Sequence, residues 1–294
     1  MKPLLLALFF SFTGTSLFAQ SFELQILGIT QDAGYPQAGC DMECCGSVKP
    51  EYVSSVAIHE GNKFWLIDAT PDFTAQIAMA QSSFPESELA GIFLTHAHIG
   101  HYTGLIYLGL EAMNTKDLPV YCLPRMADFL RTNGPWKQLV ELENIKIIEL
   151  QANTGTSLGS YVSITAIEVP HRDEYSETAA FLVASKKKKA LYLPDIDKWE
   201  KWNMTLEGYL SIVDIALVDG TFFNADELPN RNIKEVPHPL VSETMVRLKD
   251  EKPANKSKIY FTHFNHTNPL LKESTEKALV EKEGFKIAKT GMLL

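Results

Sequence analysis

The sequence has 294 residues, of which 45% are hydrophobic and 21% charged, and its formal net charge is −9. This composition is typical of an ordinary globular protein that is long enough to bury a large core. The acidic balance argues against a nucleic-acid partner, because binding to a phosphate backbone requires clustered Lys and Arg. The lysine run at 186–189 lies between two apolar segments, and we interpret it as a solvated hairpin turn.

Residues 1–19 have the pattern of an export signal. Lys2 supplies a short positive region, residues 3–12 form an apolar run, and a small-residue cleavage site ends at Ala19. Polar residues interrupt the apolar run well before the length of about 20 residues that a membrane anchor needs. We therefore expect residues 20–294 to form an exported, periplasmic domain without stable membrane insertion.

From residue 22 onward, short apolar strands alternate with polar loops and helices. Strands are predicted at 22–29, 54–59, 63–67, 91–94, 120–123, 145–150, 161–168, 179–184, 190–193, 212–218 and 258–261. Helices are predicted at 72–82, 102–110, 125–132, 240–248 and 270–283. No linker-like segment or short tandem repeat divides the chain. The pattern indicates one α/β sandwich, with two sheets face to face and helices outside.

Three of the four cysteines, Cys40, Cys44 and Cys45, cluster in a loop rich in Gly and Pro, whereas Cys122 stands alone on a predicted strand. In an oxidising compartment such a cluster favours a disulfide. Three thiolates and one distant histidine would instead make a Cys3His structural zinc site. The cysteine pattern leaves both arrangements open. We interpret Cys122 as a small buried apolar residue.

A histidine run directly follows the apolar segment 89–94. It contains three of the eight histidines, His96, His98 and His101. Side chains alternate along a strand, so His96 and His98 point the same way, and a glycine turn can bring His101 onto the same centre. Imidazole is the commonest neutral ligand for zinc and related metals. The run therefore predicts a metal site.

Further polar side chains stand directly after other predicted strands. They are Asp68, His171, Asp195, Asp219 and His263. Loops at strand ends on a rigid scaffold often carry catalytic groups. Their shared position predicts that they join the histidine run in one site.

Together these motifs resemble the signature of the metallo-β-lactamase-fold metallohydrolases. That signature is His-x-His-x-Asp-His after a strand, then a distant His, a strand-end Asp and a last His. His96, His98 and His101 match the first motif, with Gly100 in place of its aspartate. The later positions are matched by His171, Asp195 and His263. The resemblance spans residue 22 to the C-terminus and implies an α/β fold, a four-layer αββα sandwich.

Within that superfamily the chain is similar to pyrroloquinoline quinone biosynthesis protein B-like and phosphonate-pathway cyclic phosphodiesterase-like members. The likeness is carried by DAGYPQ at 32–37, VDGTF at 218–222 and HFNHTNP at 263–269. It implies a structural zinc held by Cys40, Cys44, Cys45 and His266, and for that reason favours zinc over a disulfide. It also implies that His238 is an active-site general acid or a phosphate ligand, the alternative being a surface-loop histidine.

The resemblance further implies up to two active-site metals, Zn²⁺ or, in its place, Mn or Fe. The first would be held by His96, His98 and His171, leaving an open position for a water whose pKa falls to about 7. The second, about 3.5–4 Å away, would be held by His101, Asp195 and His263. Because Gly100 offers no side chain, this second position is weak or empty unless Asp219 or Asp68 substitutes. Asp68 has a competing interpretation as a residue that orients the histidines.

The leading functional interpretation is an exported metal-dependent hydrolase, in which metal-bound hydroxide attacks a small-molecule ester-like or phosphodiester substrate. Its catalytic residues would be Asp195 and His238. One alternative is a redox or cofactor-biosynthesis role with iron, like that of the pyrroloquinoline quinone relatives. Another is a non-catalytic metal-binding member of the family, which Gly100 favours.

Overall fold

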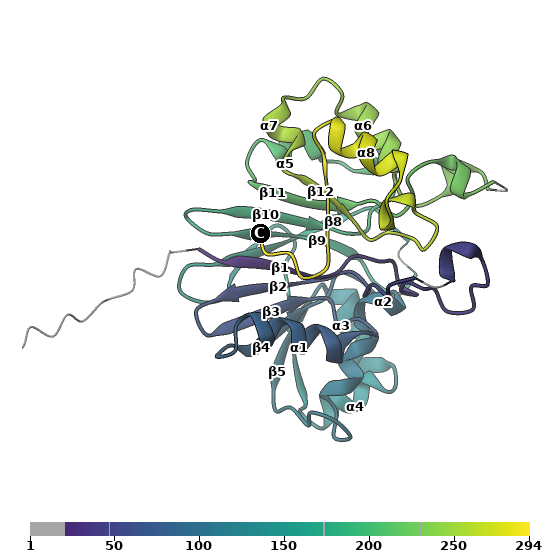
Figure 1. The fold of residues 1–294 in the computed structure, drawn as a ribbon. Helices are drawn as coiled ribbons and strands as arrows, with labels where there is room; N and C mark the ends of the chain where they lie inside the picture. Colours follow the sequence, from purple (N-terminus) through teal and green to yellow (C-terminus); the bar gives the residue numbers. More distant parts are fainter. Residues whose placement is uncertain (1–20, 47, 173, 230) are drawn as a thin grey trace, which may run out of the picture.

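The computed structural model describes residues 21–294 apart from 47, 173 and 230, so the predicted export signal at 1–19 lies outside the described residues. Two sheets pack face to face, and helices cover the outer face of each (Figure 1). The predicted four-layer αββα sandwich is therefore confirmed. Within the described part of the chain, no helix has the length and apolar character needed to cross a lipid bilayer.

The first sheet has the strand order β1-β2-β3-β4-β5-β6. Its strands are β1 (Glu23–Gly28), β2 (Ser55–Glu60), β3 (Lys63–Ile67), β4 (Glu88–Phe93), β5 (Leu118–Cys122) and β6 (Ile145–Glu149). Pairing is antiparallel from β1 to β3 and parallel from β3 to β6. The helices on this side of the sandwich are α1 (Phe73–Ser83), α3 (Pro124–Thr132) and α4 (Trp136–Glu141) (Figure 1).

The second sheet has the order β13-β12-β11-β10-β9-β8-β7. Its strands are β7 (Gly155–Ser157), β8 (Ser163–Val169), β9 (Thr178–Ala184), β10 (Lys189–Leu193), β11 (Ile215–Asp219), β12 (Ile259–Thr262) and β13 (Lys286–Ile287). Its helices are α5 (Leu206–Leu210), α6 (Val241–Arg247), α7 (Pro253–Lys256) and α8 (Thr275–Lys282). The lysine run turns between antiparallel β9 and β10, where Ser185 N–H donates to the Lys188 carbonyl at 2.8 Å, which confirms the predicted hairpin.

Strand β3 shows how the sheet is buried on both faces. Phe64 and Leu66 belong to the apolar cluster beneath the outer helices, whereas Trp65 and Ile67 belong to the cluster between the sheets. Neighbouring strand residues point to opposite faces, so a strand covered on both sides is apolar throughout. This double burial explains why the strand segments of the sequence were recognisable as short apolar runs.

The helix predicted at 102–110 is replaced by a short helix α2 (Ile99–Tyr102) and a 3₁₀ segment, Thr103–Leu108. The cause is hydrogen bonding to the loop after β3. The His101 carbonyl accepts from Ala69 N–H at 2.9 Å, and Gly104 N–H donates to the Ala69 carbonyl at 2.9 Å. These contacts divert backbone groups that a continuous α-helix would pair internally.

The helix predicted at 270–283 begins later, as α8, for a similar local reason. Asn268 caps a 3₁₀ turn that starts at Pro269, and the Ser274 hydroxyl then caps α8 by accepting from Lys277 N–H. Apart from 3₁₀ turns, the helices and strands that the sequence did not predict are α4, α5, α7, β7 and β13. Each has six residues or fewer, which is too short for a clear hydrophobic period.

Candidate metal centre

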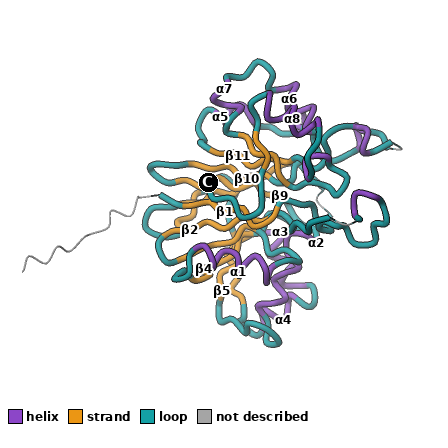
Figure 2. The backbone as a smooth tube through the Cα atoms, viewed as in Figure 1, coloured by secondary structure: helices purple, strands orange, loops and turns teal. Residues whose placement is uncertain are grey.

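The predicted site residues meet at the end of the sandwich where the parallel strands terminate. Asp68 follows β3, the histidine run follows β4, His171 follows β8, Asp195 follows β10, and His263 follows β12. Asp219 is the last residue of β11. The long loops after β1 and β11 lie at this same end, beside α2 (Figure 2). Because parallel strands share one carboxyl edge, residues far apart in sequence converge here.

His96, His98, His171 and Asp195 form the first group of candidate ligands. Each offers one ligand atom, and these atoms all lie within 4.8 Å of one another. His96 Nε2 lies 2.8 Å from His98 Nδ1 and 3.4 Å from Asp195 Oδ2. His171 Nε2 lies 3.2 Å from Asp195 Oδ1. The structure thus brings together the three histidines predicted to hold the first metal.

His101, Asp195 and His263 form the second group, again within 4.8 Å. The Nε2 atoms of His101 and His263 lie 4.0 Å and 3.8 Å from Asp195 Oδ2. Asp195 belongs to both groups and is almost completely buried. Its place between them is the one that a bridging ligand requires.

Several polar atoms of these groups are buried without a hydrogen-bond partner among the described residues. They are His101 Nε2, both ring nitrogens of His171, Asp195 Oδ1 and His263 Nε2. Leaving such an atom unsatisfied costs about 1–3 kcal/mol, so this concentration indicates a missing ligand. Two ligands held tetrahedrally at about 2.1 Å from zinc are about 3.4 Å apart. The spacings from Asp195, between 3.2 and 4.0 Å, fit a metal ion with little movement.

Asp68 and Thr95 fix the rings of His96 and His101. Nδ1 of His101 donates to Asp68 Oδ2 at 2.7 Å. The Thr95 hydroxyl lies 3.0 Å from both Asp68 oxygens and 2.9 Å from His96 Nδ1. We assign its proton to the carboxylate, so that it accepts from His96 Nδ1–H. In both histidines Nε2 then carries the lone pair and faces the centre, as metal ligation requires.

Asp219 and Thr221 repeat this arrangement on the second sheet. The Thr221 hydroxyl lies 2.7 Å from Asp219 Oδ1, 3.1 Å from His238 Nδ1 and 3.0 Å from His263 Nδ1. Asp219 Oδ2 accepts from His238 Nδ1 at 2.9 Å and from Ile196 N–H at 3.2 Å. His238, predicted from the resemblance alone, is therefore a buried part of the site rather than a surface-loop histidine.

These contacts show whether Asp68 or Asp219 can replace the aspartate that the family motif has at position 100. Asp68 and Asp219 each use both carboxylate oxygens on groups of this chain. Asp68 faces the Nδ1 side of His101, away from the Nε2 atom that approaches Asp195. Asp219, in contrast, forms a third group of possible ligands with His238 and His263, whose ligand atoms lie within 4.8 Å of one another. The geometry therefore favours an orienting role for Asp68, whereas Asp219 both orients His238 and is close enough to His263 to be a candidate ligand.

Burial and the carboxylates of Asp68 and Asp219 together set the pKa values of two histidines of the site, His101 and His238. Burial lowers the pKa of His101, but the charge and hydrogen bond of Asp68 outweigh it and raise that pKa to about 9. Burial likewise opposes protonation of His238, and the charge of Asp219 overcomes it, raising the pKa to about 10. Both rings are therefore doubly protonated and positively charged at neutral pH when no metal competes for them.

The other candidate ligands favour the forms that bind metals. Burial lowers the pKa values of His96, His98 and His263. The pKa of Asp195 is held well below its usual range: burial raises it, but the charges of His171 and His238 outweigh that effect. Metal ligation needs neutral imidazole and ionised carboxylate, and these groups supply both.

The cysteine cluster lies beside the loop that follows His263. One ligand atom from each of Cys40, Cys44, Cys45 and His266 lies within 4.8 Å of the others. The structure joins Cys40 and Cys45 as a disulfide and leaves Cys44 as a thiol. The two predicted arrangements therefore draw on the same side chains, which the fold has brought together.

Cys122 is completely buried, and burial raises its pKa to about 12, as expected of an apolar core residue. Three residues next to the candidate ligands were not predicted from the sequence: Thr95, Thr221 and Asp32, whose Oδ1 lies 3.6 Å from His101 Nε2. Thr95 and Thr221 carry no signal of their own, because their roles follow only from their contacts with Asp68 and Asp219 in the folded structure. Asp32 could have been found, because it follows the first predicted strand as the other polar residues follow theirs.

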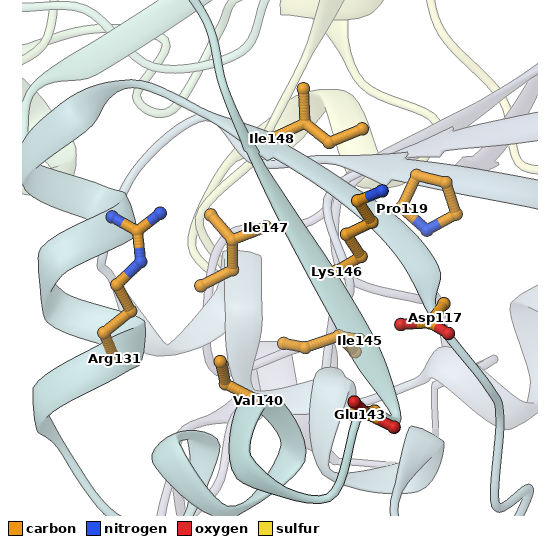
Figure 3. Close-up of a pocket in the computed structure, with 9 residues that line it drawn as sticks. All are labelled: Asp117, Pro119, Arg131, Val140, Glu143, Ile145, Lys146, Ile147 and Ile148. Carbon is orange, nitrogen blue, oxygen red and sulfur yellow. The ribbon is translucent and has the colours of Figure 1, made fainter.

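A surface pocket of about 550 Å³ lies elsewhere, along the edge strand β6 (Figure 3). It is lined by Asp117, Pro119, Arg131, Val140, Glu143, Ile145, Lys146, Ile147 and Ile148. Arg131 is paired with Glu149 at 2.6 Å, and Glu143 is paired with Lys116. None of the candidate ligands lines this pocket, so it does not belong to the metal centre.

Residues 65–264 match the family model described as Beta-lactamase superfamily domain, and this span includes every candidate active-site ligand. Among curated proteins, the chain is 26% identical to Coenzyme PQQ synthesis protein B of Nitrosococcus oceani and 27% identical to that of Ectopseudomonas mendocina. Each alignment covers 92% of this chain and 98% of the relative.

Solved structures agree on the fold. Zn²⁺-bound PqqB from Methylobacterium extorquens superposes with a TM-score of 0.76 at 22% identity, covering 92% of this chain and 99% of that one. A diphosphatase from the PhnP family superposes with a TM-score of 0.67 at 19% identity, covering 93% and 96%. The chain therefore belongs to the beta-lactamase superfamily and has the metallo-β-lactamase fold.

Proposed function

We propose that the protein is a metal-dependent hydrolase that acts on a small-molecule ester-like or phosphodiester substrate. The observation that carries this proposal is the set of buried, unpartnered ligand atoms converging on Asp195 from both sheets. A metal such as Zn²⁺ bound there would supply a hydroxide nucleophile at neutral pH. The diphosphatase with the same fold supports a phosphorus-containing substrate.

In this proposal, different residues of the site would bind the metal and contact the substrate. His96, His98 and His171 would hold one metal, while Asp195 joins their group to that of His101 and His263. His238 is anchored through Nδ1 by Asp219, so its opposite nitrogen, Nε2, would serve as the general acid or phosphate contact. Because Asp219 fixes the orientation of the His238 ring before substrate binds, the ring would be in place to stabilise the charge that develops during the reaction.

Hydrolysis of bis(p-nitrophenyl) phosphate and p-nitrophenyl acetate, together with metal content, tests the proposal. We expect the His96→Ala variant to lose at least about a hundredfold in rate and to lose active-site metal. The His59→Gln variant, altered at a buried histidine outside the site, should retain both. Unchanged hydrolysis in His96→Ala would rule out this site. Metal binding without turnover would indicate a non-catalytic member, and bound iron with oxygen uptake a redox enzyme.

We also propose that the protein is exported and that the mature chain starts at Gln20. The basic, apolar and small-residue pattern of residues 1–19 supports this. Mass spectrometry of the periplasmic fraction should find an N-terminal peptide that begins at Gln20. Recovery of the intact N-terminus from the cytoplasm alone would contradict export.

We propose a structural zinc at Cys40, Cys44, Cys45 and His266 when the cysteines are reduced. The proximity of all four ligand atoms supports it. Zinc content that falls by one equivalent in Cys44→Ser is the expected result. Unchanged zinc, with Cys40 and Cys45 recovered as one disulfide-linked peptide, would show that the cluster is a disulfide instead.

A further inference from the structure

We infer that Asp32 supplies the carboxylate that Gly100 lacks, and so completes the second metal position with His101, Asp195 and His263. The inference rests on the proposed function, since it concerns a metal of the same site. Its basis is that the loop after β1 delivers a carboxylate to the place where the motif aspartate would project.

The first observation is the position of the Asp32 carboxylate. Its Oδ1 accepts a hydrogen bond from Gly100 N–H at 3.0 Å and lies 3.6 Å from His101 Nε2. A Cβ atom placed on Gly100 would collide with Oδ1 and lie 2.6 Å from the Asp32 Cα. Asp32 therefore occupies the space of any side chain at position 100, and only glycine leaves room for it.

The second observation is that the backbone on either side of the site holds this loop in place. Gln31 N–H donates to the Phe264 carbonyl at 2.9 Å, and Phe264 N–H donates to the Ile29 carbonyl at 2.7 Å. The Asn265 side chain donates to Gln31 Oε1 at 2.7 Å. Phe264 directly follows His263, so one set of hydrogen bonds positions Asp32 relative to a ligand of the second group.

The third observation is that Asp32 retains capacity to bind a metal. A carboxylate has about four acceptor positions, and the Asp32 hydrogen bond to Gly100 uses one of them. Its distance of 3.6 Å from His101 Nε2 is close to the spacing of about 3.4 Å between two ligands of one zinc ion. His101 Nε2 is itself buried and unpartnered, so a metal between the two atoms would satisfy both.

A purely structural role also predicts the contact with Gly100, because a carboxylate can accept a backbone N–H near the start of α2. Asp32→Asn separates the two roles. Asparagine keeps an oxygen that can accept from Gly100 N–H, but it loses the charge that a second metal needs. Asp32→Ala removes both, and Asp128→Asn is the matched control, an exposed carboxylate on α3.

The experiment reloads chelated protein with Zn²⁺ and measures equivalents bound and their affinities by chelator competition, with Cys44→Ser marking the cysteine site. We expect Asp32→Asn to weaken one active-site equivalent at least about tenfold and to leave the other unchanged. The thermal midpoint of the metal-free Asn variant should match that of wild type. Asp32→Ala should lose the weaker equivalent altogether, while Asp128→Asn keeps both.

Wild-type affinity for both equivalents in Asp32→Asn and Asp32→Ala would overturn the inference and leave Asp32 as a cap of α2. A wild-type protein with a single active-site metal would also overturn it, although hydrolysis at one metal would keep the proposed function. Absence of any active-site metal from wild type would defeat the proposed function and the inference together.

Discussion

The buried carboxylate of Asp68 accepts a 2.7 Å hydrogen bond from Nδ1 of His101. Asp68 adopts a positive φ of 70°, a conformation in which Asn is among the better tolerated residues. Asp68→Asn therefore preserves the backbone while placing an amide donor against donor groups. We expect the affinity of the second metal to fall 10- to 100-fold, because the His101 tautomer is no longer held.

Competition with a chromophoric chelator measures that loss, and Asp128→Asn again provides the control. An Asp68→Asn protein that binds both active-site metals as tightly as wild type would show that His101 does not depend on this carboxylate for its orientation.

Gly100→Ala should destabilise the protein and weaken the second metal at the same time. The new Cβ would meet Asp32, including its Cα at 2.6 Å, so the loop must move away. Overpacking of this kind costs about 1–3 kcal/mol. Gly155→Ala is the reference, because there the nearest atom to the added Cβ is the Thr165 hydroxyl at 3.7 Å. Urea denaturation of the two metal-free variants makes the comparison, and equal midpoints would contradict the predicted collision.

His238→Gln should slow turnover without removing metal. His238 contacts Asp219 and Asp195 through Nδ1, at 2.9 and 3.2 Å, and we assign its Nε2 to the substrate. Loss of a positioned general acid reduces rate about 10²- to 10⁴-fold. The measurement is kcat on the phosphodiester substrate together with metal content. A variant that loses metal in parallel with activity would instead assign His238 to the metal.

His59 should make the free energy of unfolding depend on pH. This β2 residue is buried, lies 3.0 Å from Gln25 Oε1 and stacks on Phe84, and burial lowers its pKa to about 4. In the unfolded chain the pKa is about 6.5, so the unfolded state binds the proton first as the solution is acidified. The contribution of His59 to the free energy of unfolding is fully present above about pH 6.5 and is lost as the pH falls toward 4.

With allowance for solvent screening, the free energy of unfolding contributed by His59 falls by about 2 kcal/mol over this pH range. His59→Phe keeps the aromatic stack but cannot titrate, and its stability should fall less between pH 7 and pH 4.5. The comparison uses chelated protein, because the candidate ligand histidines release metal in acid. Parallel pH profiles for the two proteins would show that His59 does not contribute.

Much of the site could be predicted because its signals are local. Alternation of side chains along a strand is enough to place His96 and His98 on one side. The rule that strand-end loops carry function identified Asp195 and His263 without reference to any partner. The short elements were not predictable in the same way, and the helix expected at 102–110 was broken by hydrogen bonds to Ala69, a residue far from it in sequence.

By itself the sequence determined the strands, the histidine run and the absence of a side chain at Gly100, since each is a property of neighbouring residues. Only the tertiary structure decided what stands in that space. Asp32 and Gly100 are separated by 68 positions, and they meet because the segment around Gln31 pairs with Phe264. Hydrogen bonds between backbone segments that are distant in sequence depend little on residue type, so no local sequence pattern predicts them.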